Sequence, residues 1–378
     1  MTAKMPAKVM VVIGTRPEVI KLAPVVHALT DAPDMAVRVV TTNQHEEMVE
    51  QMLGVFSLKP DHALRLMEPD QTLCRIGGRV LQAMEETLAA ERPDVVLVQG
   101  DTTSAMAAAL AAFYTRTAVG HVEAGLRTGD RDHPFPEEMN RRLIGQIADL
   151  HFAPTERARR ALLDEGVPDA AITVTGNTIV DALETIRRQA PALPSSLAHL
   201  AADDRPLVLV TAHRRESFGA PMERICRALR EIARRAPEAR LVFPVHLNPT
   251  VRATVLPALS GVPGVHLIEP VDYLAMVALL LRARLVITDS GGVQEEAAAL
   301  GRPTLVLRER TERMEGIEAG VARQVGTDPA RIVAAALELL HDRDAHAAMA
   351  RPSDCYGDGA AAARIVAALR AWRGRRTS

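Results

Sequence analysis

Short runs of β-branched and other apolar residues alternate with amphipathic helical patterns along the whole chain. This alternation constrains the fold most, because it is the pattern of βαβ units around a parallel sheet. In the first half, strands are predicted at residues 9–13, 37–42, 95–99, 118–122, 150–154 and 172–176. In the second half, they are predicted at 207–211, 240–245, 265–268, 285–288 and 303–307. The predicted fold class is therefore α/β, with two doubly wound, Rossmann-like domains.

The boundary between the two domains is predicted from composition. Residues 187–206 are rich in Pro, Ala and Ser and lack a strand pattern. We therefore assign 1–186 to the first domain and 187–357 to the second, and we expect a last helix at about 358–378, with Trp372, to pack back on the first domain. Ligands of doubly wound sheets bind outside the carboxyl ends of the strands, so the active site is expected in the cleft between the domains.

Charge and cysteine content exclude several classes of protein. The 378 residues carry 45 Lys and Arg against 47 Asp and Glu, a formal net charge of -2, so no broad positive field is available for nucleic acid or anionic lipid. Cys74, Cys226 and Cys355 are too few and too scattered for a disulfide framework or a CxxC metal site. The sequence has no signal-peptide pattern and no apolar run of about 20 residues, so a cytoplasmic protein is expected.

Two cations lie at the helix that follows the first predicted strand. Arg16 stands at the start of this helix and Lys21 lies about one turn on. A helix N-terminus with such neighbours can hold a phosphate or a carboxylate. The alternative is an ordinary βα turn with solvated charges.

Three acids mark the ends of neighbouring elements in the first domain. Asp101 and Glu123 end consecutive predicted strands, and Glu137 opens a helix after a Pro-Phe-Pro sequence. Each alone would serve as a helix cap or a favourable charge at a helix start. Together they are expected to converge and to act in proton transfer. The glycine-containing loop after Glu123 carries Arg127 and is a candidate lid, whereas His121 is interpreted as structural.

The second domain offers two histidines at strand ends. His213 follows the strand at 207–211 with Arg214 and Arg215 beside it, where a phosphate-bearing ligand would lie. A lone histidine there would more often be structural. His246 repeats the position one strand further on and is interpreted as a supporting or effector-binding residue.

The stretch TDSGGVQEE predicts an anion-binding site. Ser290, Gly291 and Gly292 form a tight turn into a helix whose free backbone N–H groups suit a diphosphate. Glu296 lies about one turn further on, where a carboxylate accepts the hydroxyls of a ribose. The alternative is a plain Ser/Gly helix start.

These motifs, taken in order, closely resemble the non-hydrolysing UDP-N-acetylglucosamine 2-epimerases. The likeness covers nearly the whole chain, through GTRPEVIKLAPV, TNQHEEM, QGDTTSAMAAALAAF, GHVEAGLRTGD, PFPEEMNR, VTGNTIVDAL, TAHRRES, FPVHLNP and TDSGGVQEE. It implies a glycosyltransferase-B-like fold and interconversion of UDP-N-acetylglucosamine and UDP-N-acetylmannosamine. It also implies a homodimer that needs no metal or other cofactor.

The resemblance also assigns residues to roles. The residues implicated in catalysis are Asp101, Glu123, Glu137 and His213. Those implied to bind the substrate are Arg16, Lys21, Ser290, Gly291, Gly292, Glu296 and Arg313. Substrate bound at a second, allosteric site activates many bacterial members, and the residues in the motifs that form this site are Gln44, Glu138, Arg215 and His246.

The chain departs from the usual family pattern at three places. Residues 308–315 read RERTERME where RDTTERPE is common, so charged residues replace small polar ones and Met314 replaces a proline. Ser217 stands where asparagine is common. Asp132 and His133 stand where an aromatic residue and a serine are common. These changes bear on the identity of the sugar and on activation more than on the reaction type.

The chemistry implied by the resemblance explains the two sets of residues. Departure of UDP leaves an oxocarbenium-like C1, which acidifies the C2 proton, so a carboxylate can remove it to give 2-acetamidoglucal. Ser290 at its helix start, Arg16, His213 and Arg313 would stabilise the departing diphosphate. Asp101, favoured for proton transfer, would share the sugar chemistry with the other two acids, and the order of acid and base stays open. The product would supply a surface polysaccharide pathway.

Three other functions stay open at this stage. A 2-epimerase for a modified UDP-acetamido sugar would keep the same motifs. A glycosyltransferase of the same architecture would need an acceptor and would have little use for three acids facing the sugar. A UDP-sugar sensor would lose the acids or His213, which this chain keeps.

Overall fold

The computed structural model describes residues 5–42, 46–66, 68, 71–201 and 203–376. The chain divides into two compact units. Unit 1 comprises Met1–Ala182 with Gly357–Ser378, and unit 2 comprises Leu183–Tyr356. The division after Ala182 falls inside a helix, whereas the composition of the sequence places the boundary after residue 186.

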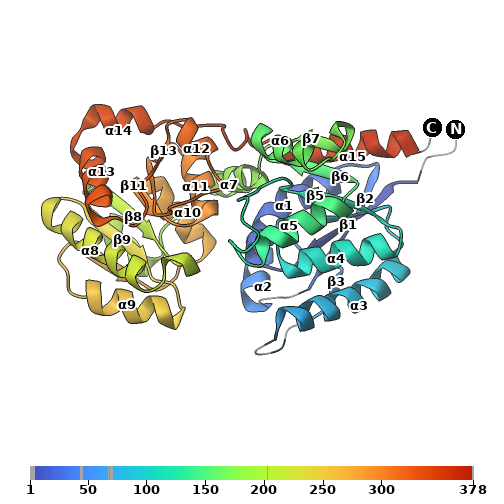
Figure 1. The fold of residues 1–378 in the computed structure, drawn as a ribbon, viewed down its shortest axis with the longest axis horizontal. Helices are drawn as coiled ribbons and strands as arrows, with labels where there is room; N and C mark the ends of the chain where they lie inside the picture. Colours follow the sequence, from blue (N-terminus) through green and yellow to red (C-terminus); the bar gives the residue numbers. More distant parts are fainter. Residues whose placement is uncertain (1–4, 43–45, 67, 69–70, 202, 377–378) are drawn as a thin grey trace. The chain divides into compact units, whose positions relative to one another are not determined.

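Unit 1 is built on a seven-stranded sheet in the order β3-β2-β1-β4-β5-β6-β7 (Figure 1). All its strand pairs are parallel. The strands are β1 (Ala7–Ile13), β2 (Met35–Thr41), β3 (His62–Ala63), β4 (Val95–Gln99), β5 (Ala118–Val122), β6 (Leu150–Ala153) and β7 (Ile172–Val174). The direction of winding reverses between β1 and β4, which makes their carboxyl ends the expected place for a ligand.

Helices cover both faces of this sheet. They are α1 (Arg16–Thr30), α2 (Glu46–Val55), α3 (Leu73–Glu91), α4 (Thr103–Tyr114), α5 (Glu137–Ile147), α6 (Glu156–Asp164) and α15 (Ala361–Arg376), with a 3-10 turn at Asp169–Ala171. The division between the units falls inside α7 (Thr178–Arg188). Met10 and Val12 point to one face and pack into a cluster with α3, α4 and α5. Val9 and Val11 point to the other face and are just as buried, as a central parallel strand requires. Helix α15 packs beside α1.

Unit 2 repeats the design with a six-stranded parallel sheet in the order β10-β9-β8-β11-β12-β13. The strands are β8 (Leu207–Thr211), β9 (Arg240–Pro244), β10 (Val265–Ile268), β11 (Ala283–Thr288), β12 (Thr304–Val306) and β13 (Ala322–Gln324). Winding reverses between β8 and β11. The 3-10 turns lie at Ser195–Ala201 and Arg215–Ser217, and the helices are α8 (Ala220–Arg235), α9 (Pro249–Leu259), α10 (Tyr273–Arg282), α11 (Gly291–Ala299), α12 (Glu315–Glu318), α13 (Pro329–His341) and α14 (Arg343–Met349).

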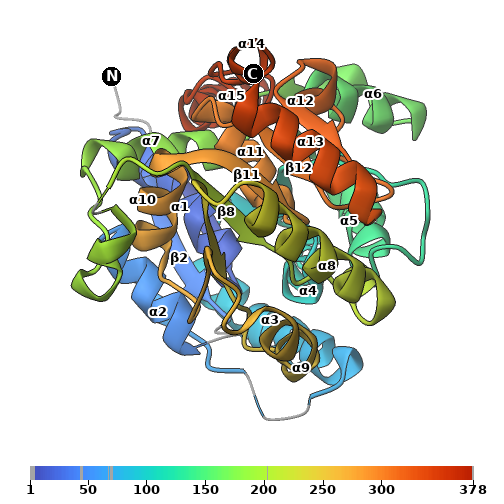
Figure 2. The ribbon, with the colours of Figure 1, turned by 90° about the vertical axis from the view of Figure 1, so that its left-hand side faces the viewer.

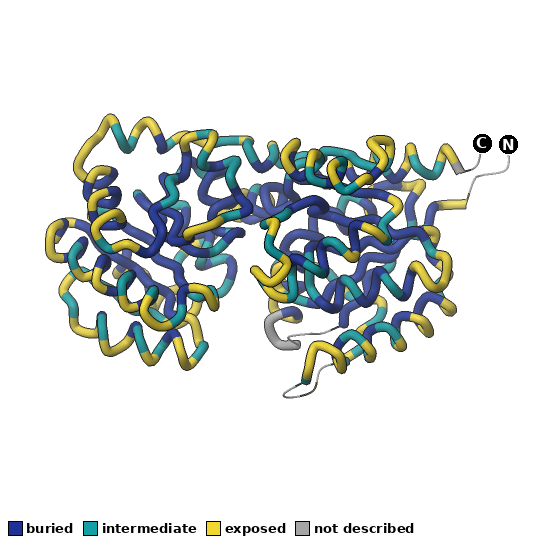
Figure 3. The backbone as a smooth tube through the Cα atoms, in the orientation of Figure 1, coloured by how far each residue is buried: buried dark blue, intermediate teal, exposed yellow. Residues whose placement is uncertain are grey.

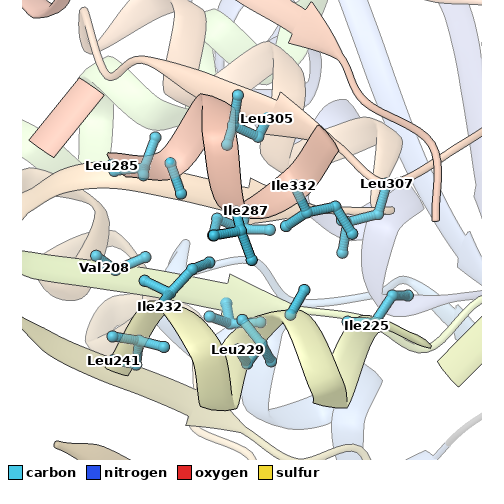
Figure 4. Packing of buried hydrophobic residues seen from close by; sticks show 14 of the residues in the cluster. Val208, Ile225, Leu229, Ile232, Leu241, Leu285, Ile287, Leu305, Leu307 and Ile332 are labelled. Carbon is cyan, nitrogen blue, oxygen red and sulfur yellow. The ribbon is translucent and has the colours of Figure 1, made fainter. Parts of the chain in front are cut away.

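The core of unit 2 lies on both sides of its sheet. Leu285 and Ile287 of β11 face α8 and α13, which lie side by side (Figures 2 and 4). Val286, between them in sequence, belongs to a second cluster with α10 and α11. Figure 3 shows the strands of both sheets as buried and the exposed positions mostly on outer helices and loops. This two-sided burial explains why the strands are continuous apolar runs in the sequence.

The predicted fold class is confirmed, since both units are doubly wound parallel α/β sheets. All eleven predicted strands are present, with ends that differ by at most two residues. The short strands β3 and β13 were not predicted, because strands of two or three residues carry no periodic signal. Among the described residues, no helix is both long enough and apolar enough to cross a bilayer.

Candidate active site

In each unit, predicted site residues follow the two strands at which winding reverses. In unit 1, Arg16 follows β1 and Asp101 follows β4. In unit 2, His213 follows β8 and Ser290 follows β11. The strand order therefore gathers residues that are far apart in sequence, at the position where doubly wound folds bind ligands.

Glu123 of unit 1 is held by three side-chain donors. Its carboxylate is buried and accepts hydrogen bonds from Lys21 Nζ at 2.5 Å, from Asn177 Nδ2 at 3.1 Å and from Gln99 Nε2. Its φ of 66° lies in the left-handed region, which costs a residue with a Cβ roughly 1–2 kcal/mol. Such an outlier is typical of a functional position. Sequence reasoning missed Gln99 and Asn177, although both lie in or directly after predicted strands.

Asp101 lies at the same edge and is oriented by an arginine. Arg141, on α5, donates to its Oδ2 from Nη2 at 2.7 Å and from Nε at 2.8 Å. The alternative that Asp101 caps α4 is wrong, because Thr102 is the N-cap and accepts from the backbone N–H of Ala105 at 3.0 Å. The Asp101 side chain stays 25 % exposed. It is therefore held in place but open to a ligand.

Glu18 connects the two strand ends and was missed by sequence reasoning. Its Oε2 accepts from the backbone N–H groups of Gly14 at 2.5 Å and Thr15 at 2.7 Å, after β1. Its Oε1 accepts from the hydroxyl of Thr102 at 2.7 Å, after β4. Burial raises the pKa of Glu18 to about 7, and the charge of Asp101 acts in the same direction. The only sequence signal is its place three residues after Thr15, as in a capping box.

Glu137 and Glu138 begin α5 but differ in environment. The Oε2 atom of Glu137 is buried and has no hydrogen-bond partner within the described part of the chain. Glu138 is fully buried and accepts from Thr128 N at 3.0 Å, from Arg142 at 3.2 Å and from Arg141 at 3.4 Å. Glu138 thus ties the preceding loop to α5. Its predicted allosteric role stays a prediction.

The candidate lid loop is also anchored through Arg127, next to the contact of Thr128 with Glu138. Arg127 donates to both carboxylate oxygens of Glu165 at 2.8 Å. His121 is completely buried, and its Nε2 donates to the carbonyl oxygen of Gly100 at 2.7 Å. Burial lowers the pKa of His121 to about 3, so the ring is neutral. Its structural role stays a prediction.

The two cations predicted after β1 lie in different surroundings. Lys21 is buried against Glu123, whereas Arg16, the first residue of α1, is exposed. Among the described residues Arg16 has no hydrogen-bond or ion-pair partner. Of the pair, Arg16 is therefore the better candidate for a direct contact with an anion.

His213 in unit 2 is supported by Asp289, a residue that sequence reasoning also missed. The backbone N–H groups of His213 and Arg214 and the hydroxyl of Ser217 each donate to Asp289 Oδ2 at 2.9 Å. The imidazole of His213 stacks on that of His246, with ring centroids 5.3 Å apart. The departure at Ser217 therefore keeps a side chain that can donate to Asp289.

The turn after β11 opens the N-terminus of α11. Ser290 is the N-cap, but its side chain makes no capping hydrogen bond, which argues against a plain helix start. A Cβ on Gly292 would meet no atom within 4 Å, whereas a Cβ on Gly291 would lie 2.3 Å from Arg313 Cζ. The guanidinium of Arg313 therefore packs directly against the start of the helix.

Arg313 belongs to a buried chain of ion pairs. It donates to Glu295 at 2.8 Å and also pairs with Glu312, which accepts from Arg308 at 2.8 Å. Arg308 in turn donates to Glu216 at 2.5 Å. These pairs fix the loop at residues 308–315 to the turn after His213 and to α11.

The residues of this loop that depart from the family pattern lie outside that chain. Glu309 is exposed and accepts from the backbone N–H of Thr327 at 3.0 Å. Arg310 is exposed and has no partner among the described residues. Met314 is half-buried and is the N-cap of α12. The altered positions therefore do not remove the contacts that hold Arg313.

Glu296, the predicted ribose ligand, is also held by a neighbour. The buried hydroxyl of Tyr273, at the start of α10, donates to Glu296 Oε1 at 2.8 Å. Burial raises the pKa of Tyr273, and the adjacent carboxylate adds to the effect, so the phenol stays protonated. Tyr273 carried no motif signal.

The remaining predicted residues are less constrained. Arg215 and His246 are exposed in unit 2, and Gln44 lies outside the described residues. Over the ranges that the structure describes, no group of three or more His, Cys, Asp or Glu side chains is arranged to hold a metal ion.

Comparisons with known proteins agree with these features. The sequence model of the UDP-N-acetylglucosamine 2-epimerase family matches residues 27–370. The chain is 51 % identical to UDP-N-acetylglucosamine 2-epimerase of Salmonella typhimurium over 372 residues, 97 % of this chain and 99 % of that protein. The identity to the Escherichia coli K12 enzyme is 50 % over 369 residues, 96 % and 98 % of the two chains.

A solved structure extends the likeness to three dimensions. The crystal structure of UDP-GlcNAc 2-epimerase from Neisseria meningitidis bound to UDP-GlcNAc superposes with a TM-score of 0.91 at 41 % identity. It covers 96 % of this chain and 99 % of that one. With fold, motifs and sequence in agreement over nearly its whole length, the chain belongs to the UDP-N-acetylglucosamine 2-epimerase family.

Proposed function

We propose that this protein interconverts UDP-N-acetylglucosamine and UDP-N-acetylmannosamine by inverting C2 of the sugar. The observation that carries the proposal is the sorting of family motif residues onto the carboxyl ends of central strands in the two units, at or next to each winding reversal. Unit 1 places Asp101 and Glu123 at the ends of β4 and β5, and unit 2 places His213 and Ser290 at the ends of β8 and β11. Acids for the sugar and donors for the nucleotide are the two sets that this reaction requires.

The reaction proceeds by elimination and readdition. The C1–O bond breaks and its electron pair leaves with UDP, which gives C1 oxocarbenium character. A carboxylate then takes the C2 proton, the C1–C2 double bond of 2-acetamidoglucal forms, and UDP stays bound. Protonation of C2 on the opposite face and attack of a UDP oxygen on C1 produce the epimer. Each proton taken is matched by one returned, so no redox step occurs.

Unit 2 stabilises the leaving group. The free N–H groups at the start of α11 and the open space beside Gly292 suit the diphosphate, and Arg313 adds positive charge next to Gly291. His213 supplies a further donor, and Glu296 accepts the ribose hydroxyls. Because these groups are fixed before the reaction, they stabilise developing negative charge without reorganisation.

Unit 1 handles protons and positive charge on the sugar. Asp101 is oriented by Arg141 but remains partly exposed, which favours it as a proton-transfer group. Glu137, with one oxygen that has no partner among the described residues, is the candidate for the second proton. Glu123 is held by three donors and supplies a fixed negative charge for the oxocarbenium-like C1.

We further propose that the protein is a homodimer, that substrate activates it from a second site, and that its product enters a surface polysaccharide. Phe113 and Tyr114 at the end of α4 are 57 % and 66 % exposed, and Leu143 on α5 is 44 % exposed. Large apolar side chains on neighbouring helices support a protein-binding surface there. Exposed Arg215 and His246 support the second site.

The deciding experiment is proton NMR of the purified protein with UDP-N-acetylglucosamine in heavy water, without metal, nicotinamide or acceptor. We expect deuterium at C2 together with the manno epimer. The D101N variant should turn over about 10²–10⁴-fold more slowly with UDP affinity largely kept. Absence of exchange at excess substrate, or sugar transfer that depends on an acceptor, would reject the proposal.

A further inference from the structure

Asp289 has a carboxylate oxygen that the protein leaves without a hydrogen bond. The residue is fully buried directly after β11. Its Oδ2 accepts all three hydrogen bonds described above, whereas its Oδ1 accepts none among the described residues. The imidazole of His213 lies close to Oδ1, with its Nδ1 3.8 Å away.

This arrangement calls for an explanation, because an unsatisfied buried carboxylate oxygen is costly. The three bonds to Oδ2 do not require a charge, since the amide oxygen of an asparagine would accept them equally. Only the second oxygen distinguishes aspartate from asparagine here. An asparagine would place N–H donors, in place of Oδ1, toward His213.

The other groups near His213 bear on whether its ring can carry a second proton. The backbone N–H of Asn248 donates at 3.1 Å to Nδ1 of His246, whose ring stacks on that of His213. In the loop of His213 itself, Arg214 and Arg215 are cationic, and Glu216 is engaged by Arg308. Among the described residues, Asp289 is thus an anion placed to balance an imidazolium.

We propose that Asp289 is a positioning residue that holds His213 as an imidazolium, with Nδ1–H directed to Oδ1 and Nε2–H presented to the leaving diphosphate. The inference rests on the proposed function, in which His213 faces the diphosphate. At 3.8 Å the Nδ1 to Oδ1 contact is too long for a hydrogen bond, and it tightens when the ligand binds. The carboxylate acts on the reaction only through the histidine.

The test combines kinetics with the protonation state of His213 in the full chain. The variant D289N keeps an acceptor for the three donors and turns a donor toward Nδ1. We expect kcat to fall about 100-fold or more while KM changes little, since the interaction is made mainly in the transition state. In the H213N background the same change should have almost no effect, because the histidine that it acts through is gone.

The direct readout is nitrogen NMR of the protein labelled with ¹⁵N-histidine, with UDP bound and with H213N to assign the signals. We expect both ring nitrogens of His213 to be protonated in the wild type and one in D289N. The matched control is S217A, which removes a donor to Oδ2 but leaves Oδ1 in place, so the His213 signals should not change.

Two results would overturn the inference: a neutral His213 in the wild-type UDP complex, or an equal loss from D289N with and without His213. If D289N does not fold, the wild-type spectrum alone decides. If the wild type binds UDP but shows no exchange at C2, the proposed function fails, and the His213 signals still decide whether Asp289 holds the proton.

Discussion

The two units share one architecture but present opposite electrostatics at their strand ends. Both are doubly wound parallel sheets that place candidate residues at the carboxyl ends of central strands, at the winding reversal and, for Glu123 in unit 1, one strand further on. Unit 1 gathers acids there and supplies two of them with nearby donors, Lys21 for Glu123 and Arg141 for Asp101. Unit 2 gathers donors and leaves space next to them, as at Gly292. The fold determines where a ligand can bind, and the residues at the strand ends determine whether that place is acidic or rich in donors.

The difference also shows how each site is kept rigid. In unit 1, charged side chains bind one another across the reversal, and Glu18 joins the ends of β1 and β4. In unit 2, each of two donor residues is held by a buried acid: His213 donates to Asp289 from its backbone, and Arg313 donates to Glu295 from its side chain. Each acid behind a donor strengthens it for a negative ligand. The comparison therefore predicts that variants of the unit 1 acids affect the rate, that Asp289 affects the rate through His213, and that variants at the start of α11 in unit 2 affect nucleotide binding.

The largest effect is expected for E123Q. Glu123 accepts from Lys21 and Asn177 at one oxygen and from Gln99 at the other, so the new amide group must face a donor on one side. Gln99 can turn its own amide to accept, and the fold should survive. The loss of negative charge at the sugar should lower kcat about 10³-fold or more, with UDP affinity unchanged. C2 exchange in heavy water and calorimetric titration with UDP measure the two quantities.

The matched control for this prediction is E165Q. Glu165 is also an acid paired with a cation, Arg127, but it lies outside the strand-end cluster. Its replacement should change the exchange rate by no more than about threefold, since the pair is partly exposed. If E123Q instead weakened UDP binding and left kcat intact, the division of labour between the units would be wrong.

The second prediction concerns the stability of unit 1 as a function of pH. Burial raises the pKa of Glu18 from 4.5 to about 7, so ionising it destabilises the fold. The cost is absent below pH 4.5, grows as the pH rises, and is complete above pH 7 at about 3 kcal/mol. E18Q removes this titration. Relative to wild type, it should therefore gain stability between pH 5 and pH 8.

The measurement uses the only tryptophan of the chain, Trp372, which lies in unit 1. Urea unfolding followed by its fluorescence reports unit 1 even if the two units unfold separately. The difference between E18Q and wild type at pH 8, minus that at pH 5, gives the cost directly. A difference that does not depend on pH would mean that Glu18 stays protonated throughout or is not buried in solution.

The sequence predicted the fold better than the site, for a physical reason. Central strands such as β4, β5 and β8 are buried on both faces, so each is an apolar run with visible ends. Residues directly after those runs, such as Asp101, could be found in the same way. Their partners could not, since Asp289 meets the backbone of His213 across 76 residues and Glu18 meets Thr102 across 84. Only the strand order brings such pairs together.

The third prediction separates the two glycines at the start of α11. A Cβ on Gly291 would overlap the guanidinium of Arg313, which cannot move freely because Glu295 and Glu312 hold it. G291A should therefore destabilise unit 2 by about 1–3 kcal/mol. G292A meets open space and should leave the melting temperature unchanged or slightly higher. Because that space is proposed to hold the diphosphate, G292A should weaken UDP binding about tenfold.

Thermal melting and UDP titration of both variants form the check. The comparison would fail if G292A destabilised the protein and kept full UDP affinity, because Gly292 would then be needed for packing rather than for the ligand. If G291A instead loses UDP affinity only in proportion to its loss of folded protein, Gly291 is needed for packing and Gly292 for the ligand.

The smallest effect is expected at the altered loop. Arg310 is exposed and has no partner among the described residues, whereas its neighbours Arg308, Glu312 and Arg313 are buried in ion pairs. R310T restores the common family residue and should change stability by less than about 0.5 kcal/mol. UDP affinity should change by less than about twofold, because the contacts that position Arg313 are all made by other residues. A tenfold change would instead place Arg310 at the ligand. The departures at residues 308–315 would then take part in recognising the substrate. Arg310 would in that case be a further donor of unit 2, in addition to those that ion pairs hold in place.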